Sequence, residues 1–144
     1  MTETWAPARR RGRPPASDSA LTRERILQAA QKVFAESGYE AATFQAIAAE
    51  IGLTRPAINN YFSSKAALYD EVAGRVSDTV LDANHVASAA PTLADQVLTF
   101  IRVGLRAQDS DPSRAAFLVQ AAMDVGHLPG GDCRAWGQVE RFVR

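Results

Sequence analysis

A glycine between two short runs of helical periodicity constrains this chain more than any other feature. The apolar residues before it are spaced i, i+3, i+4 and i+7, which places them on one face of a helix: Phe44, Ile47, Ala48 and Ile51. Gly52 then stands where a helix ends and the chain needs a residue that tolerates a positive φ. We therefore predict a helix, a turn at Gly52 and a second short helix over residues 54–62.

The predicted second helix has an apolar and a polar side. The residues expected to face inward are Ala57, Ile58, Tyr61 and Phe62. Those left outward, where they can contact another molecule, are Thr54, Arg55, Asn59 and Asn60. With a small residue, Ala48, where the helices cross, this pattern indicates a helix-turn-helix over residues 43–65. The alternative is two helices of an arbitrary helical domain, because an amphipathic helix followed by glycine occurs in many folds.

Charge is distributed unevenly along the chain, although the formal net charge of its 144 residues is zero. Residues 1–65 contain nine basic and six acidic side chains, so the remainder carries the compensating acidic excess. Because DNA is negatively charged, residues 1–65, with their basic excess, are the part expected to contact DNA. The composition, 47% hydrophobic and 22% charged, is ordinary for a soluble globular protein.

Cysteine content and hydropathy exclude several classes of protein. Cys133 is the single cysteine, which excludes an internal disulfide and a multi-cysteine zinc site and is typical of a reducing cytoplasm. No apolar run reaches membrane-spanning length, and the first residues lack the apolar core of a secretory signal. We predict a cytoplasmic protein without a metal or cofactor.

The first 20 residues are predicted to form a basic arm that does not fold alone, because they combine prolines, a glycine and arginines with little to bury. Within it, Arg11-Gly12-Arg13-Pro14 resembles the core of an AT-hook, in which Arg11 and Arg13 would lie along a narrow minor groove. A generic solubilising basic tail is the alternative, and both interpretations stay open.

Helical periodicity continues on both sides of the helix-turn-helix. A helix is predicted over residues 21–37, with Thr22 as its cap, Gly38 as its end and a buried stripe of Ile26, Leu27, Ala30, Val33 and Phe34. Thr43 is expected to cap the first helix of the motif. Ser63 and Ser64 are expected to end its second helix and cap the next, over residues 65–80.

The second half of the chain has weaker patterns. Residues 82–91 look like a linker or a frayed helix end, and helical spacing returns over residues 93–108 and 113–125. A turn beginning at His127 precedes what looks like the opening of a further helix near Trp136. Every predicted element is helical, so the predicted fold class is all-α.

A family resemblance becomes specific at this point. Thr43, Ile47 and Ala48, the Gly-Leu pair at 52–53 and the run NYFSSKAALY at 60–69 closely resemble the DNA-binding domain of the TetR family of transcriptional repressors. The resemblance spans about residues 21–76. It implies a three-helix DNA-binding head, a linking fourth helix and an all-helical ligand-binding and dimerisation body. The implied division is an arm (1–20), a helix-turn-helix domain (21–66) and a partial body (67–144).

The resemblance also implies roles for single residues. Arg55, Asn59 and Asn60 would face base edges, with Thr54 on the same outward face. Physical chemistry agrees, because Asn suits adenine N6 and N7 and Arg suits guanine O6 and N7. Phosphate contacts would come from Thr43, Tyr61 and Lys65. A merely solvated polar face is the alternative for these residues.

Three positions depart from the family pattern. The family often has a small or polar residue at Pro56, commonly a polar residue such as threonine at Ala57, and commonly tyrosine at Asn59. Specificity is therefore expected to differ. Because Pro56 biases the residue before it away from helical dihedral angles, Arg55 is expected to act as the helix cap.

For the body, the resemblance implies a small hydrophobic effector and a homodimer. We expect the helices at 93–108 and 113–125 to form pocket walls, and the isolated residues that could line a pocket are His85, Met123, His127, Cys133 and Trp136. Family members generally continue through further helices, including a pair that forms the dimer interface. The sequence is therefore expected to be a truncated product, with Trp136, Phe142 and Val143 as an apolar remnant.

Two other functions remain as alternatives. An enzyme would need a nucleophile, a base and an orienting group or a metal cluster, and the sequence offers only Asp109 and Asp111 beside Ser110 and a weak pair of His127 with Cys133. A non-specific DNA-associated helical protein would hold phosphates without reading sequence. A truncated regulator without operator binding is a further alternative. The preferred interpretation is a sequence-specific regulator, a repressor released by its effector.

Overall fold

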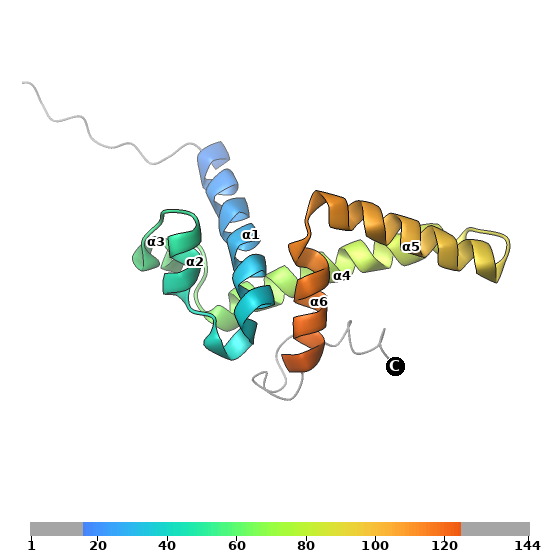
Figure 1. The fold of residues 1–144 in the computed structure, drawn as a ribbon. Coiled ribbons are helices and arrows are strands. Elements are labelled where there is room, and N and C mark those ends of the chain that lie inside the picture. Colours follow the sequence, from blue (N-terminus) through green and yellow to red (C-terminus); the bar gives the residue numbers. More distant parts are fainter. Residues whose placement is uncertain (1–15, 125–144) are drawn as a thin grey trace, which may run out of the picture.

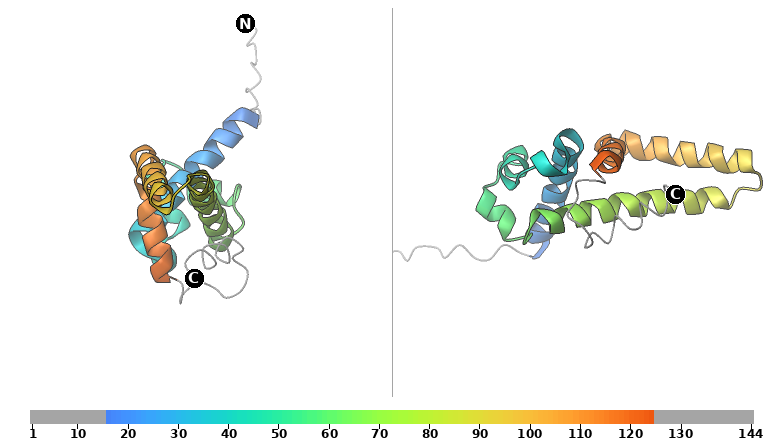
Figure 2. Two further views of the ribbon diagram at one scale, coloured as in Figure 1. Left: turned by 90° about the vertical axis from the view of Figure 1, so that its right-hand side faces the viewer. Right: turned by 90° about the horizontal axis from the view of Figure 1, so that it is seen from below.

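The computed structural model describes residues 16–124, and this part of the chain is helical without strands, which confirms the predicted all-α class. The helices are α1 (Ala16–Ala41), α2 (Phe44–Glu50), α3 (Arg55–Asn59), α4 (Lys65–Ser88), α5 (Leu93–Ser110) and α6 (Ser113–Asp124). We call α1 to α3 the head. Helices α4 and α5 run side by side as a long hairpin that projects from the head, and α6 returns to lie against α1 (Figures 1 and 2).

Helix α1 begins at Ala16, five residues before the predicted start and inside the predicted arm. Thr22 is therefore not a cap: it lies within the helix and its hydroxyl donates to the carbonyl of Asp18 at 2.8 Å. Gly38 ends the regular helix as predicted, because its φ of 76° and ψ of 172° are not helical. One further turn then reaches Ala41.

The predicted helix-turn-helix is confirmed in its elements and its turn. Thr43 caps α2 by accepting the amide N–H of Ala46 at 3.1 Å, and Gly52 has the positive φ that its turn requires, 67°. Thr54 caps α3, accepting from the amide of Ala57 at 3.3 Å. Arg55 is thus the first residue of α3 and not its cap, because Thr54 offers an oxygen in an extended conformation and Pro56 is accommodated in the first turn.

The head and the two helices behind it share one apolar core. Its largest fully buried side chains come from α1, α2, α3, α4 and α6: Ile26, Phe34, Ile47, Ile58, Leu68, Tyr69, Val72, Val76 and Phe117. The Tyr69 ring lies 4.9 Å from Phe34, 5.0 Å from Tyr39 and 5.4 Å from Phe117, between centroids. The core therefore crosses the predicted boundary at 66–67, and α4 and α6 pack on the head directly.

Ion pairs hold α1 against the first half of α4. Arg23 pairs with Glu71 and its guanidinium lies 4.7 Å from the centre of the Phe62 ring, while Arg75 pairs with Glu24 at 2.7 Å. The hydrogen bond to Glu71 raises the pKa of Arg23, and the bond from Arg75 lowers the pKa of Glu24. These pairs link α1 to the first half of α4 beside the shared apolar core.

The α4–α5 hairpin differs from the prediction at its tip. Residues 82–88, predicted as linker, belong to α4, because Ala83 and Ala87 are buried and residues 82–90 contain no glycine or proline. Helix α5 has no buried residue. Five of its aliphatic side chains are at least half exposed: Leu93, Val97, Leu98, Ile101 and Leu105.

Candidate nucleic-acid interface

Helix α3 presents its polar residues outward, as the spacing predicted. Ile58 and Phe62 are buried in the core, and Ala57 and Tyr61 are half-buried. Arg55, Asn59 and Asn60 are exposed, with Asn60 at the carboxyl-terminal cap of the helix. Their side chains form no hydrogen bond or ion pair within residues 16–124. The three predicted base-reading residues are therefore together on one outward surface.

Arg55 differs from the other basic residues of the head and of the start of α4 in its lack of a partner within the described residues. Arg23 and Lys32 pair with carboxylates, and Arg25 donates to the carbonyl of Ile51 at 3.1 Å. In the described range up to Val76, Arg55 is the basic residue whose charge has no protein partner. An exposed, unpaired guanidinium on a helix-turn-helix can bind a base edge or a phosphate from outside.

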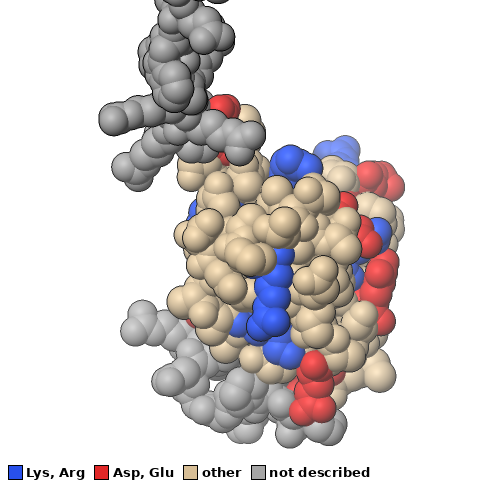
Figure 3. Space-filling model, turned by 90° about the vertical axis from the view of Figure 1, so that its left-hand side faces the viewer, with Lys and Arg blue, Asp and Glu red and all other residues tan. Residues whose placement is uncertain are grey.

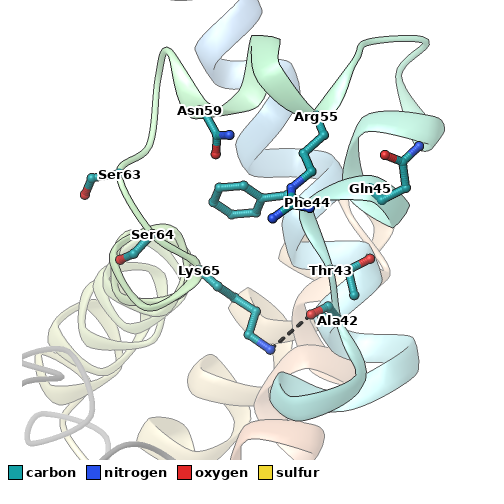
Figure 4. A pocket seen from close by; sticks show the side chains of 9 residues that line it. All are labelled: Ala42, Thr43, Phe44, Gln45, Arg55, Asn59, Ser63, Ser64 and Lys65. Atoms are coloured by element: carbon teal, nitrogen blue, oxygen red, sulfur yellow. Dashed lines mark hydrogen bonds between the residues drawn. The ribbon is translucent and has the colours of Figure 1, made fainter.

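A hollow of about 500 Å³ separates α3 from the starts of α2 and α4 (Figure 4). It is lined by Ala42, Thr43, Phe44, Gln45, Arg55, Asn59, Ser63, Ser64 and Lys65. The Thr43 oxygen accepts the Ala46 amide, so its hydroxyl proton remains available to a phosphate. Gln45 and Ser63 are exposed in this lining and sequence reasoning missed them as contacts. The sequence signal that could have identified them is their position beside a helix cap, because Gln45 follows Thr43 by two residues and Ser63 directly precedes Ser64.

Lys65 has different partners from those predicted. Its ammonium donates to the carbonyls of Tyr39 at 2.7 Å, Glu40 at 3.1 Å and Ala42 at 3.1 Å, and it lies 4.6 Å from the centre of the Tyr39 ring. An ammonium has three protons, and all three are used. In the free protein these protons are directed at carbonyls of residues 39–42, and the phosphate contact of Lys65 stays a prediction.

The remaining predicted contacts are only partly placed. Thr54 is exposed beside Arg55, with its oxygen engaged as the α3 cap. Tyr61 is half-buried and packs against the core. Arg11 and Arg13 lie outside the described residues, as do His127, Cys133, Trp136, Phe142 and Val143. The DNA contacts of all these residues stay predictions.

Basic side chains gather on the middle of the face that carries α2 and α3, while acidic side chains lie along one side and the lower edge (Figure 3). This distribution agrees with the basic front expected from the sequence. A phosphate backbone would be attracted to the centre of the face and repelled at its margin.

A second hollow, of about 450 Å³, lies between α4, α5 and α6 and is almost entirely apolar. Its lining includes predicted wall residues of α5 and α6: Phe100, Ile101, Gly104, Leu105 and Leu118. Gln108 and Arg114 are its polar members together with Thr79. His85 and Met123, proposed from sequence as pocket residues, are exposed elsewhere and do not line it.

Other sites were sought in the described residues. Between 16 and 124 no group of three or more His, Cys, Asp or Glu side chains could hold a metal ion. Of the six described helices, none has the length and apolar character needed to cross a membrane.

Comparison with known proteins agrees with this geometry. Residues 26–72, which run from α1 through the helix-turn-helix into α4, match the model of the bacterial regulatory proteins of the tetR family. This segment of the chain is therefore similar to the tetR family of regulatory proteins. The matched segment contains the exposed residues of α3 and the hollow beside them.

Two transcriptional repressors are similar to part of the chain. One is the HTH-type transcriptional repressor BepR of Brucella suis biovar 1, 41% identical over 59 residues, which are 41% of this chain and 28% of BepR. The other is the HTH-type transcriptional repressor AcnR of Corynebacterium diphtheriae, 36% identical over 70 residues, covering 46% of this chain and 37% of AcnR. The chain thus spans about a third of the length of these relatives.

Solved structures of TetR-family regulators share the fold over most of the described chain. PfmR from Thermus thermophilus superposes with a TM-score of 0.63 at 23% identity, over 83% of this chain and 65% of PfmR. A putative tetR family regulator from Shewanella sp. PV-4 gives 0.59 at 19% identity, over 84% of this chain and 65% of its own. These two structures therefore share the fold of this chain.

Proposed function

We propose that this protein is a sequence-specific DNA-binding transcriptional regulator that acts as a repressor in the cytoplasm. The observation that carries the proposal is the outward surface of α3, where Arg55, Asn59 and Asn60 are exposed and have no partner in the described protein. The names of BepR and AcnR, both transcriptional repressors, support the direction of regulation.

Base reading would use the donors and acceptors of these three side chains. In the major groove Arg55 can donate two bonds to guanine O6 and N7, and each asparagine can pair with adenine N6 and N7. Thr43, Gln45 and Ser63, around the hollow, are polar groups that could hold the flanking phosphates. One head would read one half-site, so we propose that a homodimer reads two half-sites about 34–36 Å apart.

We propose that the apolar hollow between α4, α5 and α6 is the effector site. Its volume of about 450 Å³ is within the usual range of small-molecule pockets, and its lining suits an apolar effector. Occupancy of this site would release the protein from DNA.

A catalytic function is not proposed. Two residues of the acidic loop have structural partners: Asp111 accepts bonds from Gln31 at 2.8 Å and from the Ser113 hydroxyl at 2.7 Å, and Ser110 donates to the carbonyl of Arg106. These bonds join the end of α5 to α1 and to α6.

Selection of bound DNA from a random pool by the full chain tests the proposal. Recovery of one recurrent sequence is expected. Recovery of DNA without a recurrent sequence, at moderate salt, would instead support non-specific association, and recovery of no DNA would reject the DNA-binding function.

Single substitutions refine this test. Asn59→Ala or Asn60→Ala should reduce discrimination between the selected site and a one-base variant by roughly 1–3 kcal/mol. Asn84→Ala, at an exposed asparagine of α4 far along the hairpin, is the matched control. Equal losses on all DNA sequences would contradict base reading by these asparagines.

A further inference from the structure

A single side chain of α1, Arg23, contacts both the segment that follows α3 and the first half of α4. Two of its guanidinium nitrogens, Nη1 and Nη2, donate to the two carboxylate oxygens of Glu71. The same guanidinium lies over the Phe62 ring, 4.7 Å from its centre. A planar guanidinium can make both contacts at once, because its edge carries the N–H donors and its face stacks on an aromatic ring.

Phe62 is one of two buried anchors behind the outward surface of α3. Helix α3 has five residues, and the buried residue within its bounds is Ile58. Phe62, three residues after the helix ends, is also buried, and its amide donates to the carbonyl of Ile58 at 3.1 Å. So short a helix is not stable alone, and its orientation depends on what it packs against. Asn59 and Asn60 lie between the two anchors in the sequence, so their direction depends on both.

The pair with Glu71 holds the Arg23 guanidinium in one orientation. Two parallel bonds between a guanidinium and a carboxylate fix both groups in one plane, which a single bond does not. Both side chains are partly shielded from solvent, so salt screens the pair less than a fully exposed one. The Phe62 ring therefore packs against a group of fixed orientation rather than against a mobile cation.

A second ion pair between the same two helices lacks the contact with the ring. Arg75 of α4 donates through one nitrogen to Glu24 of α1 at 2.7 Å, and the two side chains are exposed to a similar degree. Within residues 16–124 the Arg75 guanidinium does not stack on an aromatic ring. Both pairs link α1 to α4, but Arg23 also contacts a residue beyond the end of α3.

We propose that Arg23 and Glu71 are positioning residues for base reading by α3. They fix the Phe62 ring, and Phe62 fixes the direction of Asn59 and Asn60; neither member of the pair contacts DNA in this role. The inference rests on the proposed function, because it concerns the same surface of α3. It places two determinants of specificity outside the helix-turn-helix.

Arginine-to-lysine substitutions test this role without a change of charge. A lysine keeps the cation but has neither the two-pronged edge nor the flat face of arginine. Arg23→Lys should therefore reduce discrimination between the selected site and a one-base variant about fivefold, with an unchanged salt dependence of binding. Arg75→Lys is the matched control and should keep discrimination within about twofold of wild type. Equal discrimination by the two variants would overturn the positioning role of Arg23.

The carboxylates of the two pairs give a second matched comparison. By charge alone, Glu71→Gln and Glu24→Gln should both strengthen binding to all DNA sequences. Glu71→Gln should in addition reduce discrimination between the selected site and its one-base variant about fivefold, whereas Glu24→Gln should not. If the two glutamine variants discriminated equally well, Glu71 would have no positioning role.

Hydrogen exchange of the Phe62 amide, measured on the full chain without DNA, keeps this inference distinct from the proposed function. Arg23→Lys should accelerate that exchange about fivefold, and Arg75→Lys should not. Unchanged exchange in Arg23→Lys, or equal acceleration in both variants, would reject the positioning contact even if the chain selects a DNA sequence.

The opposite combination of results rejects the proposed function instead. Faster exchange only in Arg23→Lys, in a chain that selects no recurrent DNA sequence, would confirm the link from Arg23 to Phe62. It would reject sequence-specific binding, and with it a positioning role in base reading. Thermal unfolding of each variant shows that it is folded.

Discussion

The head and helix α5 use their apolar residues in opposite ways. In the head, apolar side chains such as Phe34 and Ile58 are fully buried, and the exposed face of α3 is polar. In the hairpin, α5 buries no residue and exposes large aliphatic side chains beside an apolar hollow. The head thus buries its apolar residues in a core shared with α4 and α6, whereas α5 presents an apolar surface suited to an apolar ligand or to another protein surface.

Core truncation gives the largest expected contrast between the two regions. Phe34→Ala should lower the free energy of unfolding by about 3–5 kcal/mol, because Phe34 is 1% exposed and packs against Tyr69. Leu98→Ala on α5, where the side chain is 57% exposed, should change it by less than about 0.5 kcal/mol. Urea unfolding of both variants measures these changes. Similar losses of unfolding free energy would show that the exposed α5 side chain contributes as much to stability as the buried Phe34.

Glycine substitutions should separate the break in α1 from the regular helix α4. Gly38→Ala is expected to cost roughly 1–3 kcal/mol, because its dihedral angles suit only glycine and its Cβ would crowd Gln120. Gly74→Ala, with open space around it in α4, should stabilise by about 0.5–1 kcal/mol. Thermal unfolding of the two variants measures both signs. A stabilised Gly38→Ala protein would show that the break is not required.

Acid should weaken the connection that returns the hairpin to the head. Burial raises the pKa of Asp111, but bonds from Ser113 and Gln31 outweigh burial and leave the pKa lowered. A lowered folded pKa stabilises the protein above the unfolded carboxyl pKa of about 4, and that contribution is lost as the pH falls through the folded value.

Replacement of this carboxylate tests the same connection. Asp111→Asn should therefore cost roughly 1 kcal/mol at pH 7 and less in acid. Unfolding measured across this pH range checks the trend. Asp109→Asn, two residues earlier on the hairpin, is the control and should show little pH-dependent difference. The connection would not depend on the Asp111 charge if both variants behaved alike.

The smallest expected effect concerns the apolar hollow. Leu105 lines it and Leu98 does not. Leu105→Ser should lower the affinity for decanol about fourfold, the loss expected for roughly one buried methylene group, whereas Leu98→Ser should leave it unchanged. Calorimetric titration with decanol measures both. Equal loss of decanol affinity in the two variants would indicate that decanol binds the exposed face of α5 and not the hollow.

Much of the head could be predicted because its signals are local. The turn at Gly52, the caps at Thr43 and Ser64 and the outward placement of Asn59 depend on residues within a few positions of one another. Helix ends were less predictable. Thr22 looked like a cap, but the helix continues through residues 16–20, and α4 continues where a linker was expected because burial of Ala83 and Ala87 favours helix there.

The sequence by itself determined the helix-turn-helix and which side chains α3 turns outward, since periodicity, glycine and capping act over one or two turns. Only the tertiary structure decided the partners of Lys65 and Asp124. Lys65 meets Tyr39 across 26 positions of the chain, and Asp124 meets it across 85. Contacts over such separations depend on how α1, α4 and α6 pack. From the sequence, Lys65 at the start of α4 could be assigned only a phosphate as its partner. The packed helices place three backbone carbonyls beside its ammonium group.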